Sequence, residues 1–159
     1  MITGEQVFLP AFSSGQSRLT IDGSEYHHLI RVRRFVRDSE IWVVNGKGAA
    51  VLARIDNISD DSLELVVLEE HSNRGEINQE LILAVANLKG DHLNLIVEKA
   101  TELGVHQIVP LLTEHTVKRG INRSRLERIA IAAMKQSRRS RLPEIQDMVP
   151  FTQYVKSAS

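Results

Sequence analysis

The chain has 159 residues, enough for one ordinary domain or two small ones. Apolar residues make up 42% and charged residues 25%, so the chain can bury a core and has no disordered composition. It contains no cysteine, which excludes a disulfide framework and a thiolate zinc site. No stretch approaches the roughly 18 apolar residues of a membrane span, and the N-terminus lacks a secretory pattern. The sequence therefore predicts a soluble, cytoplasmic protein without a membrane partner.

The formal net charge is zero, but the charges are unevenly distributed. The stretch from Asp56 to Glu70 has six acidic residues and no basic one, whereas the stretch from Thr113 to Arg141 has nine basic and two acidic residues. This asymmetry favours one solvated acidic face and one surface suited to a polyanion. The alternative for the basic stretch is a charged helix that is only solvated.

The first 70 or so residues are predicted to be rich in β-structure. Five short runs of Val, Ile and Leu separated by turn residues are typical of a small barrel or sandwich: Gln6–Leu9, Arg18–Ile21, Glu40–Val44, Ala50–Ile55 and Ser62–Leu68. Asn45-Gly46 predicts a tight turn, because both residues tolerate positive φ. Between the strands, Ser24–Val32 predicts a short helix with Ser24 as its N-cap.

A different pattern begins after the polar segment Ser72–Gly75, where we expect a domain boundary. Glu80–Ala86 is a nearly continuous apolar run, as in a strand that is buried on both faces. Asp91 would cap the helix that follows, and Gly104 would end it. Its expected buried face comprises Leu93, Ile96, Val97, Ala100 and Leu103. Gln107–Leu112 predicts a second strand, parallel to the first.

A basic helix is predicted next, beginning with a capping box formed by Ser124 and Glu127 and ending at Pro143. Its expected buried stripe comprises Leu126, Ile129, Ala130 and Ala133. At about 100° per residue, the opposite side carries Arg125, Arg128, Lys135 and Arg139. Beyond the helix, Glu144–Val149 is a candidate third strand.

Several kinds of catalytic or metal site lack support in the sequence. His27 and His28 are adjacent, so on a helix they point about 100° apart, which favours packing or a phosphate contact over a shared metal ion. Lys89-Gly90-Asp91 lacks the full phosphate-loop pattern. No serine nucleophile elbow occurs. We therefore expect no metal site, and a metal or nucleotide hydrolase has no motif to support it.

The candidate RNA-binding residues lie in two places. One is the basic run near the predicted N-terminal helix, which also includes Arg37, and the other is the exposed face of the basic helix. Guanidinium groups suit phosphate because they donate two parallel hydrogen bonds. With few exposed aromatic residues, contacts to the shape and backbone of structured RNA are favoured over base stacking. The predicted set is Arg31, Arg33, Arg34, Arg125, Arg128, Lys135 and Arg139.

Three ordered blocks of the sequence resemble a known family. The first is His28–Arg34 with the glycine turn Asn45–Gly48. The second is Lys89-Gly90-Asp91 followed by Glu98–Val105 and Pro110. The third contains Ala133, Gln136-Ser137, Arg139 and Leu142–Ile145. In this order and spacing the blocks are similar to those of the bacterial small-subunit ribosomal RNA uridine-N3 methyltransferases.

The resemblance implies an α+β and α/β architecture in two domains. Residues 1–73 would form a PUA-like RNA-binding β-barrel, and residues 76–159 the first part of a SPOUT methyltransferase domain with a parallel sheet. Members of the family are homodimers that use S-adenosylmethionine to methylate N3 of one uridine in the small ribosomal subunit. Because that nitrogen is a weakly acidic imide, it must lose its proton and be held in line with the methyl group.

The sequence also departs from the family pattern. The glycine-rich cofactor loop and the later Leu-Arg-x-Glu-Thr-Ala-like segment are absent, so the cofactor site and the knot are expected beyond residue 159. The 159-residue chain is then expected to be inactive, and no catalytic or cofactor-binding residue is assigned. His115 stands where arginine is common, and Arg138 where glycine is common. The alternative function is a non-enzymatic RNA-binding or ribosome-associated module that is complete at this length.

Overall fold

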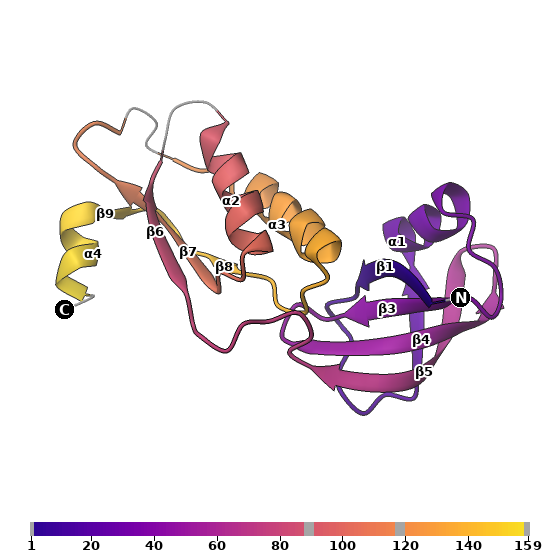
Figure 1. Ribbon diagram of the computed structural model, residues 1–159. Coiled ribbons are helices and arrows are strands. Elements are labelled where there is room, and N and C mark those ends of the chain that lie inside the picture. The colour runs from indigo at the N-terminus through magenta and orange to yellow at the C-terminus, as the bar shows by residue number, and fades with distance from the viewer. Residues whose placement is uncertain (1, 88–90, 117–119, 158–159) are drawn as a thin grey trace. The chain divides into compact units, whose positions relative to one another are not determined.

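The computed structural model describes residues 2–87, 91–116 and 120–157 (Figure 1). Internal contacts divide the chain into two compact units. The first comprises residues 1–76 together with Arg138–Arg141, and the second comprises residues 77–137 and 142–159. The assignment of Arg138–Arg141 to the first unit departs from the sequence analysis, which placed all of residues 76–159 in one domain.

A five-stranded sheet forms the first unit, and each of its strands overlaps a predicted one. The strand order is β1-β3-β4-β5-β2, with β1 parallel to β3 and the other pairs antiparallel. Alternation along the strands sends every second side chain into the core, as Leu19 and Ile21 on β2 illustrate. The strands are β1 (Ile2–Phe8), β2 (Arg18–Asp22), β3 (Glu40–Val44), β4 (Ala49–Ile58) and β5 (Ser62–Ser72).

The predicted helix between β2 and β3 is two short helices in succession, α1 (Gly23–His27) and the π-helix η1 (His28–Val32). The prediction that Ser24 caps it is wrong, because Asp22 is at the N-cap position and makes no side-chain capping bond. Tyr26 and Leu29 pack into the core of the sheet. The hydroxyl of Tyr26 lies 2.8 Å from the carbonyl oxygen of Ser59, which ties the helix to the β4–β5 turn.

The turn between β3 and β4 forms at Asn45-Gly46 as predicted, but by a different mechanism. Gly46 and Gly48 have positive φ (75° and 102°), whereas Asn45 does not. Asn45 is buried, and its Oδ1 accepts hydrogen bonds from the backbone N–H groups of Lys47 (2.8 Å) and Ala49 (3.1 Å). The asparagine thus stabilises the turn through its side chain rather than through its backbone conformation.

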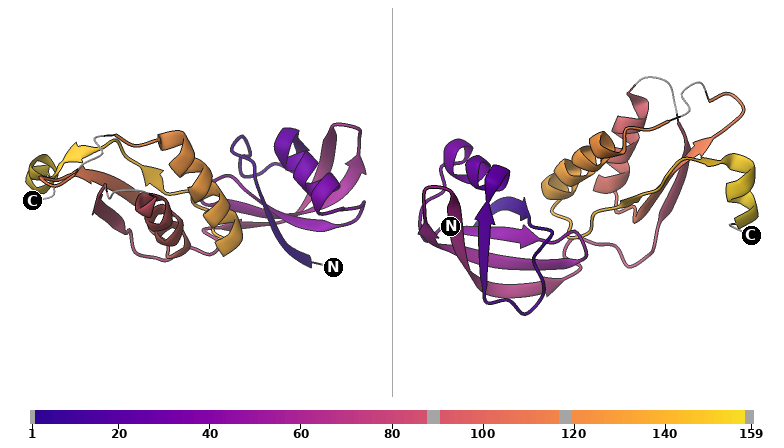
Figure 2. Two further views of the ribbon diagram at one scale, coloured as in Figure 1. Left: turned by 90° about the horizontal axis from the view of Figure 1, so that it is seen from above. Right: turned by 180° about the vertical axis from the view of Figure 1, so that it is seen from behind.

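The second unit is an α/β layer built on parallel strands. Strands β6 (Ile82–Ala86), β7 (Gln107–Leu112) and β8 (Glu144–Ile145) lie in that order, and β9 (Val149–Pro150) also pairs with β7. Helices α2 (His92–Glu102) and α3 (Arg123–Ser137) lie side by side over one face of the sheet (Figure 1 and Figure 2). The short helix α4 (Phe151–Ser157), which the sequence analysis did not predict, follows β9. The predicted parallel βαβ unit is therefore confirmed, as is the mixed α+β and α/β fold class.

Two packing predictions for this unit are wrong. We expected β6 to be buried on both faces, but it is an edge strand of this sheet, and Ile82 is 52% exposed. We expected Leu103 on the buried face of α2, but it is 74% exposed. Thr101 is buried instead, and its hydroxyl donates a hydrogen bond to the Val97 carbonyl (2.7 Å). Gly104, with φ of 95°, follows α2 at the left-handed position that favours glycine.

The ends of α3 also differ from the prediction. The helix begins at Arg123, and Asn122 caps it, since its Oδ1 accepts the backbone N–H of Arg125 (3.1 Å). The prediction that Ser124 and Glu127 form a capping box is therefore wrong. The helix ends at Ser137, well before Pro143, because Arg138 has φ of 61° and leaves the right-handed helical region.

The left-handed conformation of Arg138 leads to a stability prediction. Arg138→Gly is expected to raise the free energy of unfolding by about 0.5–1 kcal/mol, because glycine adopts positive φ without a Cβ clash. Arg138→Ala removes the same side chain beyond Cβ and keeps the strain, so it should give no such gain. Urea unfolding followed by the fluorescence of Trp42, the only tryptophan, measures both variants. Equal stabilities of the two variants would contradict the explanation.

Among the residues that the structure describes, no helix is both long and apolar enough to cross a membrane.

Candidate RNA-binding surfaces

The basic loop that follows η1 is the first candidate surface. Arg31, Arg33 and Arg34 are all exposed or partly exposed, Arg31 at the end of η1 and the other two in the loop itself. Arg33 lies 3.3 Å from a carboxylate oxygen of Glu5, whose other oxygen lies 3.4 Å from Nε2 of His28. Arg33 and His28 are therefore held next to each other by one acidic residue, while Arg31 and Arg34 extend from the same segment.

The backbone fixes this loop on the sheet. The N–H of Phe35 donates to the Leu29 carbonyl (3.1 Å), and the N–H of Asp38 donates to the Ile55 carbonyl (2.9 Å). An open hollow of about 390 Å³ lies along residues 33–39, and Val36 beside it is 64% exposed. The loop thus presents guanidinium groups and an apolar side chain from an anchored backbone, an arrangement suited to phosphates and to the face of a base.

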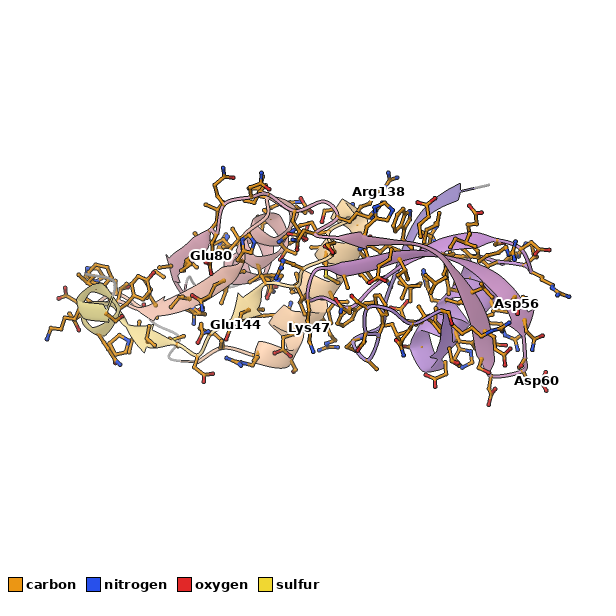
Figure 3. The ribbon with its side chains drawn as sticks, turned by 90° about the horizontal axis from the view of Figure 1, so that it is seen from below. Lys47, Asp56, Asp60, Glu80, Arg138 and Glu144 are labelled. Carbon is orange, nitrogen blue, oxygen red and sulfur yellow. The ribbon has the colours of Figure 1, made fainter. Side chains whose placement is uncertain are left out.

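The predicted acidic face lies on β4, β5 and their turn. Asp56 and Asp60 lie at the same end of this hairpin (Figure 3). Asp56 is 3.1 Å from Arg18 and 4.0 Å from Arg37, so the guanidinium of Arg37 faces this acidic residue. Arg37 is consequently a weaker candidate for a phosphate contact than Arg31 or Arg34.

The exposed side of α3 is the second candidate surface. Arg125 and Arg128 are exposed there, as predicted, while Lys135 is half-buried. Nη2 of Arg125 lies 3.1 Å from Asp91, and Nε of Arg128 donates to the carbonyl oxygen of Ser124 (3.3 Å). The two arginines are therefore positioned within one turn of each other near the start of the helix.

Arg139 is not on this surface, and its assignment to the exposed helix face is wrong. The helix has ended two residues earlier, and Arg139 is 1% exposed. Its guanidinium donates to one carboxylate oxygen of Glu76 from Nη2 (2.7 Å) and Nε (3.0 Å). The other oxygen of Glu76 accepts the backbone N–H groups of Ser140 (2.9 Å) and Arg141 (2.8 Å). A buried guanidinium bonded in this way cannot bind a polynucleotide, so Arg139 has a structural role.

Further polar residues that the sequence analysis did not single out surround this ion pair within the first unit. Nε2 of Gln6 donates to the Arg139 carbonyl (2.7 Å), and Oε1 of Gln6 accepts from Arg74 (2.9 Å). The guanidinium of Arg74 stacks on the ring of Trp42 at 3.9 Å. Burial, and then the positive charge of Arg138, lower the pKa of Arg74 from its ordinary value. No local pattern in the sequence indicated this network, because its members are far apart along the chain.

The second of the three sequence blocks, which begins at Lys89, contributes polar residues at the start of α2 and along it. Lys89 and Gly90 themselves lie outside the described residues. Asp91 occupies the N-cap position of α2 without capping it, and its carboxylate instead accepts from the side chain of Asn94 (2.8 Å) and pairs with Arg125. Lys99 on α2 bonds to Glu98 and Glu102, which raises the pKa of its amino group. Within residues 2–87, 91–116 and 120–157, no cluster of His, Asp or Glu side chains is arranged to hold a metal ion.

Comparison with known proteins matches each unit to a described domain. A family model described as the RNA methyltransferase domain matches residues 75–159, which is more than half of the chain. A second model, described as the PUA domain of RNA methyltransferases, matches residues 21–68. The chain therefore belongs to the RNA methyltransferase family, and the resemblance inferred from the three sequence blocks is confirmed.

Particular relatives narrow the comparison further. The chain is 29% identical over 143 residues to ribosomal RNA small subunit methyltransferase E of Bacillus subtilis, which covers 86% of the chain and 56% of that relative. It superposes on a probable rRNA methyltransferase from Porphyromonas gingivalis with a TM-score of 0.83 and 29% identity, over 95% of the chain and 63% of that structure. It also superposes on a ribosomal RNA small subunit methyltransferase E from Neisseria gonorrhoeae, bound to S-adenosylmethionine, with a TM-score of 0.82 and 25% identity. That superposition covers 95% of the chain and 64% of the other structure. The chain thus spans somewhat more than half the length of these relatives.

Proposed function

We propose that residues 1–159 form the RNA-binding part of an S-adenosylmethionine-dependent methyltransferase that modifies N3 of a uridine in small-subunit ribosomal RNA. One observation carries the proposal. The model of the RNA methyltransferase PUA domain matches the first unit, and the model of the RNA methyltransferase domain matches the second, although the two units were defined independently from internal contacts. The relatives named for methylation of small-subunit ribosomal RNA support the substrate class.

The exposed cations supply the affinity for RNA in this proposal. Arg31, Arg33 and Arg34 project from an anchored segment of the first unit, and Arg128 projects from α3 of the second. Arg125, also on α3, is a weaker candidate for a phosphate contact, because it is paired with Asp91 at 3.1 Å. Lys135 is a more peripheral candidate, because it is half-buried. Guanidinium–phosphate contacts position the RNA, and they carry no sequence information of their own. The proposed partner is the small ribosomal subunit, and the proposed state of the whole enzyme is a cytoplasmic homodimer.

The two hollows described in the second unit are too small for S-adenosylmethionine. The second unit has hollows of about 110 Å³ beside Asn87 and about 250 Å³ beside Tyr154. Both are smaller than the roughly 300–1,000 Å³ of pockets that enclose ligands of this size. We therefore assign no cofactor-binding residue and no proton acceptor for uridine N3 among the described residues.

Calorimetry with S-adenosylmethionine checks this assignment. The 159-residue chain is expected to give no binding heat, because neither of the two hollows described in its methyltransferase unit is large enough to enclose the nucleoside and the amino acid part together. Micromolar affinity would show that the chain carries a cofactor pocket that we have not recognised.

A methyl-transfer assay tests the proposed activity. A protein that carries these residues and the remaining length of the relatives is incubated with small ribosomal subunits and methyl-labelled S-adenosylmethionine. Nuclease digestion and mass spectrometry should then recover the label as 3-methyluridine. Label in another nucleoside would contradict the N3 assignment, and unlabelled RNA would contradict the methyltransferase function.

A further inference from the structure

A small polar hollow lies at the carboxyl end of β6, beside the first turns of α2 and α3. Its polar lining consists of three amides and one ion pair, Asn87, Asn94, Asn122, Asp91 and Arg125. In open α/β sheets, ligands bind outside the carboxyl ends of the strands. The position therefore suits a ligand. The three asparagines are not among the residues proposed above to bind RNA.

The volume of the hollow limits what can enter it. At about 110 Å³ it is smaller than the roughly 150 Å³ of a protein cavity that accommodates benzene. Because the hollow is open on one side, it can take the edge of one six-membered ring while the rest of the ligand stays outside. A purine or a complete nucleoside is too large to be enclosed.

The charges favour a neutral ligand over an anion. Arg125 is the only cation that lines the hollow among the residues described, and its guanidinium is 3.1 Å from Asp91. A phosphate would have to displace this carboxylate from Arg125 and remain close to it. Asp91 thus opposes phosphate binding, whereas it leaves a polar but uncharged group unaffected.

The inner wall of the hollow adds an apolar surface. Leu93 and Leu126 are 6% and 3% exposed, and Ile121 also lines the hollow. Asn87 is 5% exposed and is held in place, since its Nδ2 donates to the Gly120 carbonyl (3.2 Å) and its backbone N–H donates to Leu111 (3.1 Å). An apolar wall with fixed amides at the rim matches a flat heterocycle with hydrogen-bonding groups on its edge.

We propose that this hollow binds the edge of a pyrimidine base of the RNA, an inference that rests on the proposed function of the chain. Asn94 donates to Asp91 through its Nδ2, and Asn122 caps α3 through its Oδ1, so the Asn94 oxygen is the acceptor and the Asn122 nitrogen the donor proposed for the edge of uracil or cytosine. Arg128 is exposed on the neighbouring turn of α3 and would contact a phosphate next to the bound nucleotide, whereas Arg123 is paired with Asp147 at 3.1 Å. The hollow then supplies base recognition, and the helix supplies electrostatic affinity.

Nuclear magnetic resonance of the labelled 159-residue chain tests the inference. Uridine and cytidine are expected to shift the side-chain amide signals of Asn87, Asn94 and Asn122 with a millimolar dissociation constant. Inorganic phosphate should leave them in place. Asn94→Leu, which keeps the size and removes the amide, should raise the uridine dissociation constant at least tenfold. Asn78→Leu, an exposed asparagine before the opposite end of β6, is the matched control and should have no effect.

The outcomes separate this inference from the function on which it rests. If phosphate rather than uridine shifts the amides, or if Asn94→Leu binds uridine as the wild type does, the pyrimidine site is wrong. If the chain binds ribosomal RNA and no nucleoside shifts the amides, the inference fails while the proposed function stands. If uridine binds and ribosomal RNA does not, the proposed function fails, and with it the role of the hollow in RNA recognition.

Discussion

Arg139→Met is expected to lower the free energy of unfolding of the first unit by about 3–5 kcal/mol, the cost of leaving a buried charge without its partner. The two side chains of the Glu76–Arg139 pair are each 2% exposed, so the carboxylate of Glu76 cannot be solvated when the guanidinium is removed. The carboxylate also accepts hydrogen bonds from the backbone N–H groups of Ser140 and Arg141, but these two bonds cannot balance a full negative charge.

The measurement is urea unfolding followed by the fluorescence of Trp42, which lies in the first unit. Arg18→Met is the matched control. It breaks a pair with Asp56 at 3.1 Å in the same unit, but the side chain of Arg18 is 65% exposed. Because exposed pairs contribute about 0–1 kcal/mol, the control should cost no more than that. Equal costs for Arg139→Met and Arg18→Met would contradict the structural role of the buried pair.

Glu76→Gln provides a second test of the same pair. Glutamine keeps one acceptor oxygen but removes the charge, so the guanidinium of Arg139 is left buried without its counter-ion. We expect destabilisation of the same order as for Arg139→Met, about 3–5 kcal/mol. A decrease of less than about 1 kcal/mol in the free energy of unfolding would show that the amide of glutamine satisfies this site and that the charge of Glu76 is dispensable.

The second large effect is expected in RNA binding. Combining Arg31→Glu and Arg34→Glu should weaken binding of a small-subunit ribosomal RNA fragment by roughly 10- to 100-fold at physiological salt, since removing each charge-assisted hydrogen bond costs about 1 kcal/mol or more. The slope of log K against log salt should become shallower by roughly 0.7–0.9 for each phosphate that the protein no longer neutralises. Fluorescence anisotropy over a series of salt concentrations gives both quantities.

Arg33 is left unchanged in this variant, although it belongs to the same predicted set. It pairs with Glu5, so a glutamate at position 33 would add a repulsion that alters stability as well as RNA binding. Exchange of Lys47 and Lys156 for glutamate is the control, because it makes the same charge change at two exposed positions outside both candidate surfaces. Unchanged affinity and an unchanged salt slope for the Arg31 and Arg34 variant would contradict the role of the loop.

The regular elements could be predicted because their signals are local. The alternation of residues 40–44 and the apolar run of residues 107–112 are found as β3 and β7 over the predicted ranges. The burial of β6 could not be predicted from its composition, because an apolar run does not show which neighbours a strand has. The end of α3 was missed for a related reason, since glycine at position 138 would have indicated it and arginine does not.

The candidate site was predictable only in part. The basic run from Arg31 to Arg34 was visible in the sequence, and the structure leaves these side chains accessible on an anchored segment. The helical period placed Arg139 beside Arg125, but that extrapolation required the helix to continue past Ser137. Glu76 lies 63 residues before Arg139, so no local pattern could have revealed their pairing.

Binding of small-subunit ribosomal RNA by the unmodified 159-residue chain tests the central claim most directly. We predict that log K falls linearly with log salt, with a slope of roughly −2 to −4, as expected when about three to six exposed cations neutralise phosphates. No measurable binding at low salt, or an affinity that does not change with salt, would contradict the claim that this chain binds RNA through its arginine surfaces.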